Sequence, residues 1–241
     1  MRSLIFARRN ALEILRDPLT LVFGLGFPLV ILGLLTLIQA HIPVSLFELP
    51  TLTPGITVFG LAFMALFSSQ LVAKDRGSAF LQRLYTTPLT AWEYVLGYVI
   101  PLLPIALLQS LVCCLAAMAM GLAPTFRILL LVLGNTPAAL FFISLGLALG
   151  SVLNEKQVGG VCGALLTNLT AWLSGVWFDL NLIGGGFKAV CECLPFFRAV
   201  QLGQKLLSGA DGVALPLGIV CLYAAAAFAA AAVLFFRQMK K

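Results

Sequence analysis

The chain has 241 residues, of which 61% are hydrophobic and only 10% are charged. Soluble domains carry about 25% charged residues, so this composition excludes an ordinary water-soluble protein. A helix needs roughly 20 apolar residues to cross the hydrocarbon core of a bilayer, and windows of that kind recur along nearly the whole sequence. We therefore expect an all-α integral membrane protein with a single transmembrane domain over residues 1–241.

Residues 2–17 have the pattern of an amphipathic helix. Its polar side consists of Arg9, Glu13, Arg16 and Asp17, and Phe6 and Arg8 break the pattern. An amphipathic helix just before an apolar run is typical of a helix in the headgroup plane, with its arginines at anionic lipid. The sequence predicts such an interface helix, and a frayed basic tail is the alternative.

Six apolar segments are long enough for transmembrane helices. They lie at about 19–40, 55–73, 92–118, 128–151, 158–178 and 214–236. A cleaved signal peptide is the competing interpretation of the first segment, but its apolar run exceeds the usual length of about 7–15 residues. No small-x-small cleavage site follows that run either. We expect the first span to remain in the protein.

The basic residues predict the orientation, because short loops rich in Lys and Arg stay on the cytosolic side. If the amino terminus is cytosolic, six crossings return the carboxy terminus to the cytosol. The cytosolic segments then hold eleven of the fifteen basic residues: Arg2, Arg8, Arg9, Arg16, Lys74, Arg76, Arg83, Lys156, Arg237, Lys240 and Lys241. The net charge of +6 is explained by topology and gives no reason to expect nucleic acid as a partner.

A short charged segment with a helical pattern, at about 75–86, lies between the second and third spans. Residues four apart share one face of a helix, so Phe80 and Leu84 would stack on each other. The expected apolar ridge consists of Phe80, Leu81, Leu84 and Tyr85, flanked by Arg76 and Arg83. This pattern predicts a cytosolic helix that a partner protein can grip.

The connection at about 179–213 is too polar for a full crossing, yet it is rich in apolar side chains. A run of three glycines at 184–186 and Pro195 divide it into pieces of two or three helical turns. Non-helical backbone survives at membrane depth only where protein or water satisfies it. We expect short re-entrant helices that dip into the outer leaflet, and a plain extracellular loop is the alternative.

The sequence has no catalytic motif. His41 is the only histidine, so neither a zinc site of the H-E-x-x-H type nor a histidine-based catalytic triad can be assembled. There is no Walker A motif. We expect no catalytic residue, no metal site and no bound cofactor in this chain; if ATP drives the protein, another chain binds it.

The predicted spans contain essentially no charged residues away from their ends. Ion-coupled carriers usually mark their pathways with such charges. Polar residues within the spans include Gln109, Asn135 and Asn168, which are weak candidates for a substrate path. Interhelical hydrogen bonds are the favoured explanation of each residue. The mostly apolar interior suits amphipathic or lipid-like cargo better than a strongly hydrated ion.

Two stretches resemble the membrane subunit of type-2 ABC exporters, and the likeness extends over nearly the whole chain. Residues 74–98 are similar to the family's acidic-rich start, its "L-x-R-L" and "T-P-L" motifs and its "L-G-K" motif. Residues 173–178 and 194–196 are similar to its "S-G-x-x-F-P" and "L-P" motifs. Tyr98 stands where lysine is common, and Asp179 where proline is common, which blurs the subfamily.

The resemblance implies a half-transporter. Two membrane chains, identical or paralogous, would pair with two cytosolic ATPase subunits that bind ATP and Mg. The segment 75–86 would be a coupling helix docked on the ATPase. The residues implied in ATPase coupling are Asp75, Arg76, Phe80, Leu81, Arg83, Leu84, Tyr85, Glu155 and Lys156. The helices of 179–213 would cap the path, with an outer gate at Phe187, Pro195, Phe196 and Phe197.

The expected function is that of a permease subunit in the bacterial cytoplasmic membrane, with both termini in the cytosol. It would export a drug, peptide, lipid or glycan by alternating access, driven by the separate ATPase. The alternatives are a secondary transporter driven by an ion gradient and a non-transporting membrane factor for immunity or assembly. An intramembrane enzyme lacks a catalytic constellation.

Overall fold

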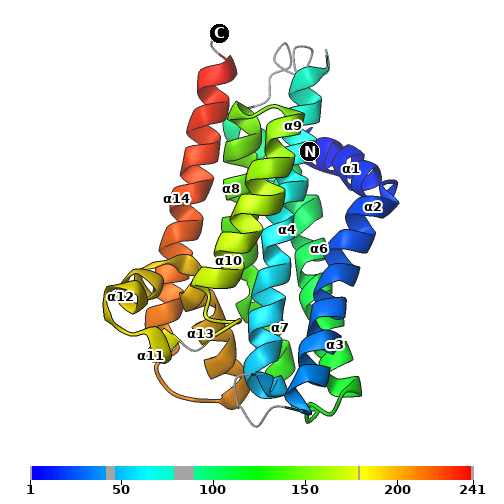
Figure 1. Cartoon of the computed structure of the whole chain (residues 1–241). Coiled ribbons are helices and arrows are strands. Elements are labelled where there is room, and N and C mark those ends of the chain that lie inside the picture. The colour runs from blue at the N-terminus through cyan, green and yellow to red at the C-terminus, as the bar shows by residue number, and fades with distance from the viewer. Residues whose placement is uncertain (1, 42–46, 79–89, 179, 240–241) are drawn as a thin grey trace.

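The computed structural model describes residues 2–41, 47–78, 90–178 and 180–239, which are mainly helical and contain no strand. The long helices stand side by side in an elongated bundle (Figure 1). Helix α1 (Arg2–Leu15) lies near the end of the bundle where the last helix, α14 (Ala214–Met239), terminates. The predicted all-α fold is confirmed.

Six helical columns form the bundle in the part of the chain that the structure describes. They are α2 (Pro18–Leu21) with the π-helix η1 (Val22–Gly26) and α3 (Phe27–Gln39); α4 (Leu49–Gly77); α6 (Ala91–Ala119); α7 (Arg127–Gly134) with α8 (Thr136–Val152); α9 (Glu155–Val158) with the π-helix η3 (Gly159–Leu166) and α10 (Thr167–Leu173); and α14.

Five of these columns are long and apolar enough to cross a membrane. They contain the segments Val22–Gln39, Leu49–Gly77, Trp92–Ala119, Arg127–Val152 and Ala214–Arg237. The remaining column, which runs from α9 to α10, corresponds to the predicted span at 158–178 but is not among the five. The chain is therefore a multi-pass membrane protein, and the sixth crossing stays a prediction.

Helix α4 is the central helix, since every residue from Leu52 to Ala65 is buried. It begins at Leu49, earlier than the predicted start at 55, and continues without a break past Asp75. Gly146 and Gly150 of α8 face it closely: a Cβ on Gly150 would lie 2.5 Å from the carbonyl oxygen of Ser69. Small residues four apart let two membrane helices approach in this way.

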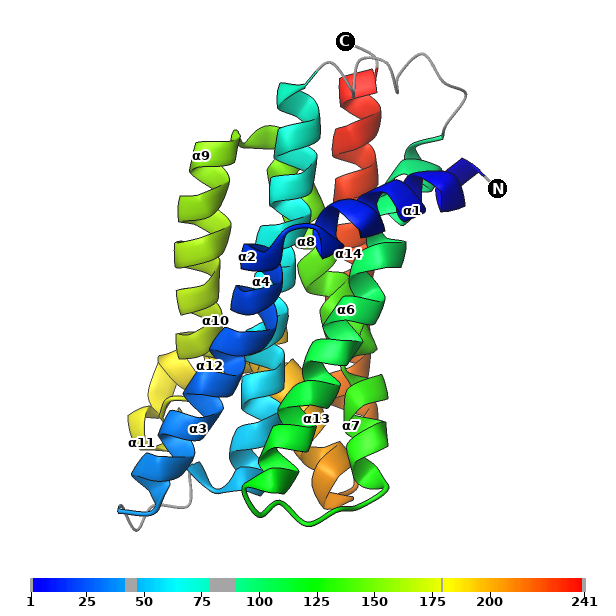
Figure 2. The same ribbon diagram turned by 90° about the vertical axis from the view of Figure 1, so that its right-hand side faces the viewer.

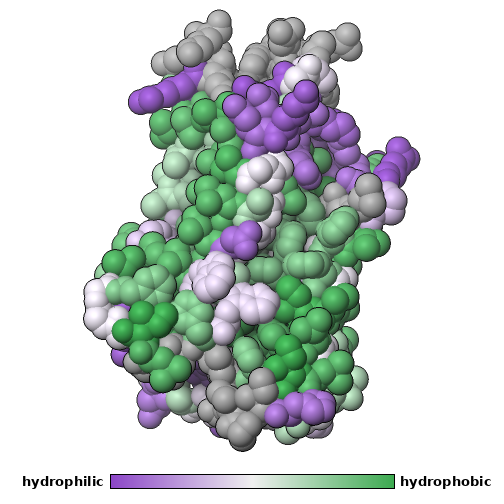
Figure 3. Space-filling view, in the orientation of Figure 1, coloured by the Kyte–Doolittle hydropathy of each residue, from purple (hydrophilic) through white to green (hydrophobic). Residues whose placement is uncertain are grey.

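Hydrophobic residues cover much of the length of the bundle on the face in Figure 3. Hydrophilic residues gather at the end that carries α9 and the carboxy terminus (Figures 1 and 3). An apolar belt bounded by polar ends matches the solvent preferences of a bilayer and its two aqueous sides.

The connection before α14 folds into α11 (Leu180–Ile183), α12 (Gly185–Cys193) and α13 (Pro195–Ser208), at the opposite end of the bundle from α9 (Figure 1). Helix α13 starts with proline, whose fixed φ suits the first helical position, and stops at Gly209, whose φ is 74°. It packs against α4, α7 and α14. Short helices were expected here, and their depth in a membrane stays a prediction.

Candidate functional site

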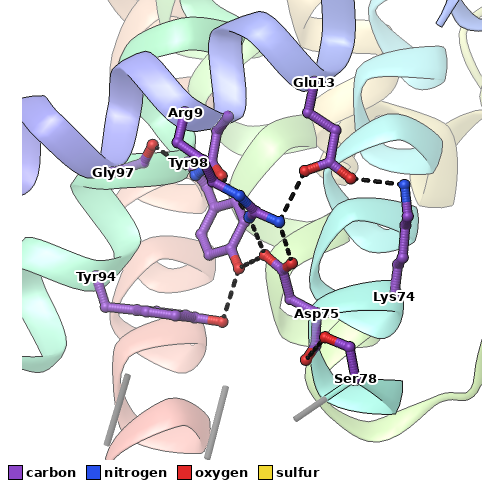
Figure 4. A network of polar contacts seen from close by, with 9 residues as sticks. Arg9, Glu13, Lys74, Asp75, Ser78, Tyr94, Gly97 and Tyr98 are labelled. Carbon is purple, nitrogen blue, oxygen red and sulfur yellow. Dashed lines mark hydrogen bonds and ion pairs between the residues drawn. The ribbon is translucent and has the colours of Figure 1, made fainter. Parts of the chain in front are cut away.

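Helix α1 lies obliquely across α4 and α6 near the end of the bundle where the C-terminal helix also ends (Figure 2). Its buried residues are Phe6, Ala7, Asn10 and Ile14, whereas Ile5 and Leu15 are exposed. Phe6 therefore anchors the helix to the protein, although it breaks the amphipathic pattern. Arg9 belongs to the side expected at lipid headgroups, but it points toward α4 instead (Figure 4).

Asp75, near the end of α4, is the centre of a polar network (Figure 4). Its carboxylate is 2% exposed and accepts hydrogen bonds from both terminal nitrogens of Arg9, each at 2.7 Å. The hydroxyl of Tyr98 on α6 donates a third bond at 2.6 Å. Tyr94, one turn earlier, donates to the Tyr98 hydroxyl at 3.1 Å. Three charge-assisted hydrogen bonds, two donated by Arg9 and one by Tyr98, compensate for burying the carboxylate.

Glu13 connects this network to the exposed surface. It pairs with Arg9 at 2.9 Å and with Lys74 at 2.6 Å. Burial lowers the pKa of Arg9, but the hydrogen bond and charge of Asp75, with the charge of Glu13, outweigh that effect and raise the pKa. Arg9 therefore stays charged, and the two acidic groups balance Arg9 and Lys74.

Apolar and backbone contacts complete the attachment of α1. The Phe6 ring lies edge-on to Tyr98 and stacked on Tyr94, with centroids 5.0 and 5.7 Å away. It occupies the space beside Gly97 that a Cβ would fill. The amide of Asn10 donates to the Gly97 carbonyl at 3.1 Å. Helix α1 is thus fixed to both α4 and α6.

Arg76, the next residue after Asp75, makes contacts on a different side of α4. Its guanidinium donates to the carbonyls of Gly150 at 2.9 Å and Leu153 at 3.3 Å, at the end of α8. The turn that follows is closed by a capping box, in which Asn154 and Gln157 each accept from the other's backbone N–H. Arg76 therefore holds the end of α4 against the α8–α9 turn.

A groove of about 680 Å³ lies between these two segments. Its lining includes Lys74, Arg76, Gly77, Ser78, Asn154, Glu155 and Lys156. Glu155 and Lys156 are exposed at the start of α9. The structure therefore brings three of the residues implied in ATPase coupling, Arg76, Glu155 and Lys156, into one groove.

Of the other six residues implied in coupling, the structure describes only Asp75. Asp75 faces the interior, where it holds Arg9 and Tyr98, and offers almost no surface to a partner. The remaining five are outside the described residues: Phe80, Leu81, Arg83, Leu84 and Tyr85. Their role in docking stays a prediction.

A second cavity, of about 700 Å³, opens along the bundle between α3, α4 and α10. Phe23, Phe27, Ile31, Phe59, Phe63, Thr167, Asn168, Trp172 and Trp177 contribute to its lining. Volumes of 300–1,000 Å³, aromatic walls and a few polar groups are typical of small-molecule sites. Both π-helices border the cavity, through Phe23 of η1 and through Gly163 and Ala164 of η3.

The three polar residues considered for a substrate path differ in position. Asn168 lines this cavity. Gln109 and Asn135 are buried inside the bundle, where Gln109 donates to the Cys113 sulfur at 3.3 Å and Asn135 to Ser110 at 3.2 Å. Hydrogen bonding between or along helices accounts for these two contacts.

The four residues expected at an outer gate all lie in the α12–α13 region. Pro195 and Phe196 are buried, and Phe196 packs on Phe141 and Phe142 of α8. Phe187 is partly exposed and lies near Phe178, while the Arg198 guanidinium lies over the Phe197 ring. Phe196 thus fixes α13 to the bundle, and a gating role for the four stays a prediction.

The fold and these contacts define a multi-pass membrane protein with a charged, groove-bearing end. The chain belongs to the ABC-2 type transporter family, whose model matches residues 3–207. It is also similar to Nodulation protein J of Bradyrhizobium diazoefficiens, with 25% identity over 230 residues that cover 93% of this chain and 85% of that protein. The resemblance noted in the sequence is confirmed, and the chain is a membrane subunit of an ABC transporter.

Proposed function

We propose that this chain is the permease half of an ATP-driven exporter. Two membrane chains, each crossing the bilayer six times, pair with two cytosolic ABC ATPase subunits, which bind ATP and Mg. Nucleotide binding and hydrolysis in the ATPases drive alternating access of a path through the permease. The cargo is amphipathic or hydrophobic, of the drug, peptide, lipid or glycan class.

The observation that carries the proposal is the groove that the end of α4 and the α8–α9 turn form together in a chain of this family. The end of α4 and the α8–α9 turn lie about 75 residues apart in sequence, yet Arg76 bonds to Gly150 and Leu153 across them. Charged groups of both signs, Lys74, Glu155 and Lys156, surround the groove. A rigid, two-part charged surface of this kind suits docking of a folded protein partner.

The positions of the basic residues support a cytosolic location for the end of the bundle that carries the groove. The end of α4, the start of α9, helix α1 and the last turn of α14 share one end of the bundle (Figures 1 and 2). Seven of the fifteen basic residues belong to these segments, which favours the cytosolic side for this end. They are Arg2, Arg8, Arg9, Lys74, Arg76, Lys156 and Arg237. The aromatic cavity between α3 and α10 offers apolar cargo a place beside the bundle, with Asn168 and Thr167 as polar contacts.

A charge exchange in the groove tests the proposal. The chain is coexpressed with candidate ABC ATPases from its own genome, and the partner that copurifies is retained. Glu155→Lys combined with Lys156→Glu keeps the net charge but reverses both local charges. We expect association to weaken at least roughly tenfold, which corresponds to 1.4 kcal/mol.

The control exchanges an ion pair at the other end of the molecule. The charged groups of Lys188 and Glu192 of α12 lie 3.9 Å apart, and their side chains are 38% and 39% exposed. Lys188→Glu combined with Glu192→Lys is expected to leave copurification unchanged. Failure of every ABC ATPase to copurify with the unaltered chain, or equal loss in both exchanges, contradicts the proposal.

A further inference from the structure

Asp75 and Arg76 are adjacent at the end of α4, but they bind different neighbouring segments. Asp75 holds Arg9 of α1 through two hydrogen bonds. Arg76 holds the carbonyls of Gly150 and Leu153 at the end of α8. One short stretch of α4 is thus tied to two segments that are distant from each other in sequence.

Each of the two segments leads directly into one wall of the aromatic cavity. Helix α1 ends at Leu15 and is followed by α2, η1 and α3, which supply Phe23, Phe27 and Ile31. The α8–α9 turn is followed by η3 and α10, which supply Asn168 and Trp172. The Asp75 contact is therefore connected to the α3 wall, and the Arg76 contact to the α10 wall.

Both connections are suited to transmitting a displacement. The Asp75 carboxylate is buried with charge-assisted bonds, so separating it from Arg9 would leave an uncompensated charge in the interior. The capping box of Asn154 and Gln157 keeps the α8–α9 turn, which Arg76 contacts, in one conformation. Each wall also includes a π-helix, η1 or η3, and π-helical turns often mark places where a helix rearranges in function.

We propose that Asp75 and Arg76 are positioning residues that divide a movement of the cytosolic end of α4 between the two cavity walls. Asp75 acts through Arg9 and α1 on the α3 wall. Arg76 acts through the α8–α9 turn on the α10 wall. This inference rests on the proposed function, because the movement at α4 is supplied by the docked ATPase.

Two reporter cysteines distinguish the walls. Phe27→Cys reports on α3 and Trp172→Cys on α10, since both side chains line the cavity and are substantially exposed. Each is introduced separately into a chain in which the exposed cysteines are replaced, Cys193→Ser and Cys221→Ser; the other four cysteines are buried. The probe is fluorescein maleimide, and its labelling rate is measured with and without ATP on the complex of the chain with its copurifying ATPase.

In the otherwise unaltered complex, ATP is expected to change the labelling rate at both positions. Asp75→Asn, or Arg9→Gln, should abolish the ATP response at position 27 and retain it at position 172. Arg76→Gln should give the reverse pattern. Arg8→Gln is the matched control, because it removes the same charge as Arg9→Gln from the adjacent, exposed position of α1, and it should retain both responses.

A purely structural role predicts a different result. It would lower the yield of the complex on size-exclusion chromatography and change the responses at both positions together. That outcome, or two intact responses in every variant, overturns the division between the walls while leaving the proposed function standing. An absent ATP response in the unaltered complex, despite ATPase binding, contradicts the ATP-driven mechanism itself.

Discussion

The carboxylate of Asp75 accepts bonds from a guanidinium and from a phenol, and the phenol can be removed without removing charge. Hydrogen bonds to charged groups contribute about 1.5–3 kcal/mol, whereas bonds between neutral groups contribute about 1 kcal/mol. Tyr98→Phe should therefore lower the free energy of unfolding by about 1.5–3 kcal/mol. Thermal unfolding of the purified chain in detergent measures this change.

Tyr94→Phe is the matched control for that substitution. The Tyr94 hydroxyl donates to the neutral hydroxyl of Tyr98 at 3.1 Å, and both rings are buried in the same layer. Its removal should cost less, about 1 kcal/mol. Equal losses in the two variants would show that Asp75 draws no special stabilisation from the phenol.

At the level of single residues, the sequence predicted positions better than partners. Asp75 and Arg76 were both singled out for a role in ATPase coupling, which stays a prediction. Their contacts within the chain, with Arg9 and Gly150, join positions 66 and 74 residues apart, and no periodicity connects such positions. Two signals pointed to the network: the apolar Phe6 interrupted the polar side of α1, and Tyr98 replaced a lysine common in the family.

Among the helices, the contact between α4 and α8 depends on glycine. A side chain at Gly150 would meet the backbone of Ser69, which is part of α4 and has little freedom to move away. Gly150→Leu should destabilise the fold by about 1–3 kcal/mol or more, because overpacking forces the two helices apart. The thermal midpoint in detergent and the yield of folded protein measure the effect.

Gly218→Leu on α14 is the control, since a Cβ at Gly218 meets no atom within 4 Å and the position is exposed. It makes the same chemical change in a helix that faces away from other elements at that point. A loss of stability as large as that of Gly150→Leu would mean that helix propensity, and not close approach, explains the glycine.

The expected coupling helix at 75–86 makes its own prediction. Phe80→Asp combined with Leu84→Asp places charge on the apolar ridge inferred from the sequence, where burial against a partner would be unfavourable. Membrane insertion should be retained, while ATPase copurification and stimulated ATP hydrolysis are lost. Ser208→Asp adds a charge at the opposite end of the bundle and should retain both. Retention of both in the double variant would contradict the coupling assignment.

Helix existence was predictable throughout, because apolar runs of this length have few other structures available in a membrane. The bounds of the helices were harder to predict. The second span was predicted to start at about 55, yet α4 begins at Leu49 with Pro50 in its first turn, where a missing N–H costs little, and it includes Pro54 in its interior. The column at 155–173 contains a π-helix whose hydrogen-bond register leaves no mark in hydropathy. Contacts with α4 and α6 determine which side of α1 is buried, and the periodicity of α1 alone could not predict that side.

For the molecule as a whole, orientation is the prediction with the simplest measurement. Ser78 is exposed at the end of α4, beside the groove. Ser78→Cys should resist a membrane-impermeant maleimide in intact cells and react after the cells are opened. The same substitution at Ser208, exposed at the opposite end, should react in intact cells. Labelling of position 78 from outside would reverse the topology.

The energy source is a second property of the whole assembly. Proteoliposomes that contain this chain and its copurifying ATPase should accumulate a fluorescent phospholipid analogue, used as an amphipathic probe, only when ATP is supplied. A proton gradient without ATP should have no effect, since the predicted spans lack charged residues at their centres. Transport driven by the gradient alone would favour a secondary carrier.

The buried junction of Arg9, Asp75 and Tyr98 also constrains the order of biogenesis. Ribosomes add about 5–20 residues per second, so several seconds separate the synthesis of Arg9 from that of its two partners. Until Tyr98 has entered the membrane, the Asp75 carboxylate at the end of the second span is incompletely neutralised in the nascent chain. Chains truncated between residues 78 and 98 should consequently be favoured substrates for membrane proteases, whereas truncation just after Ala119 should yield a longer-lived fragment.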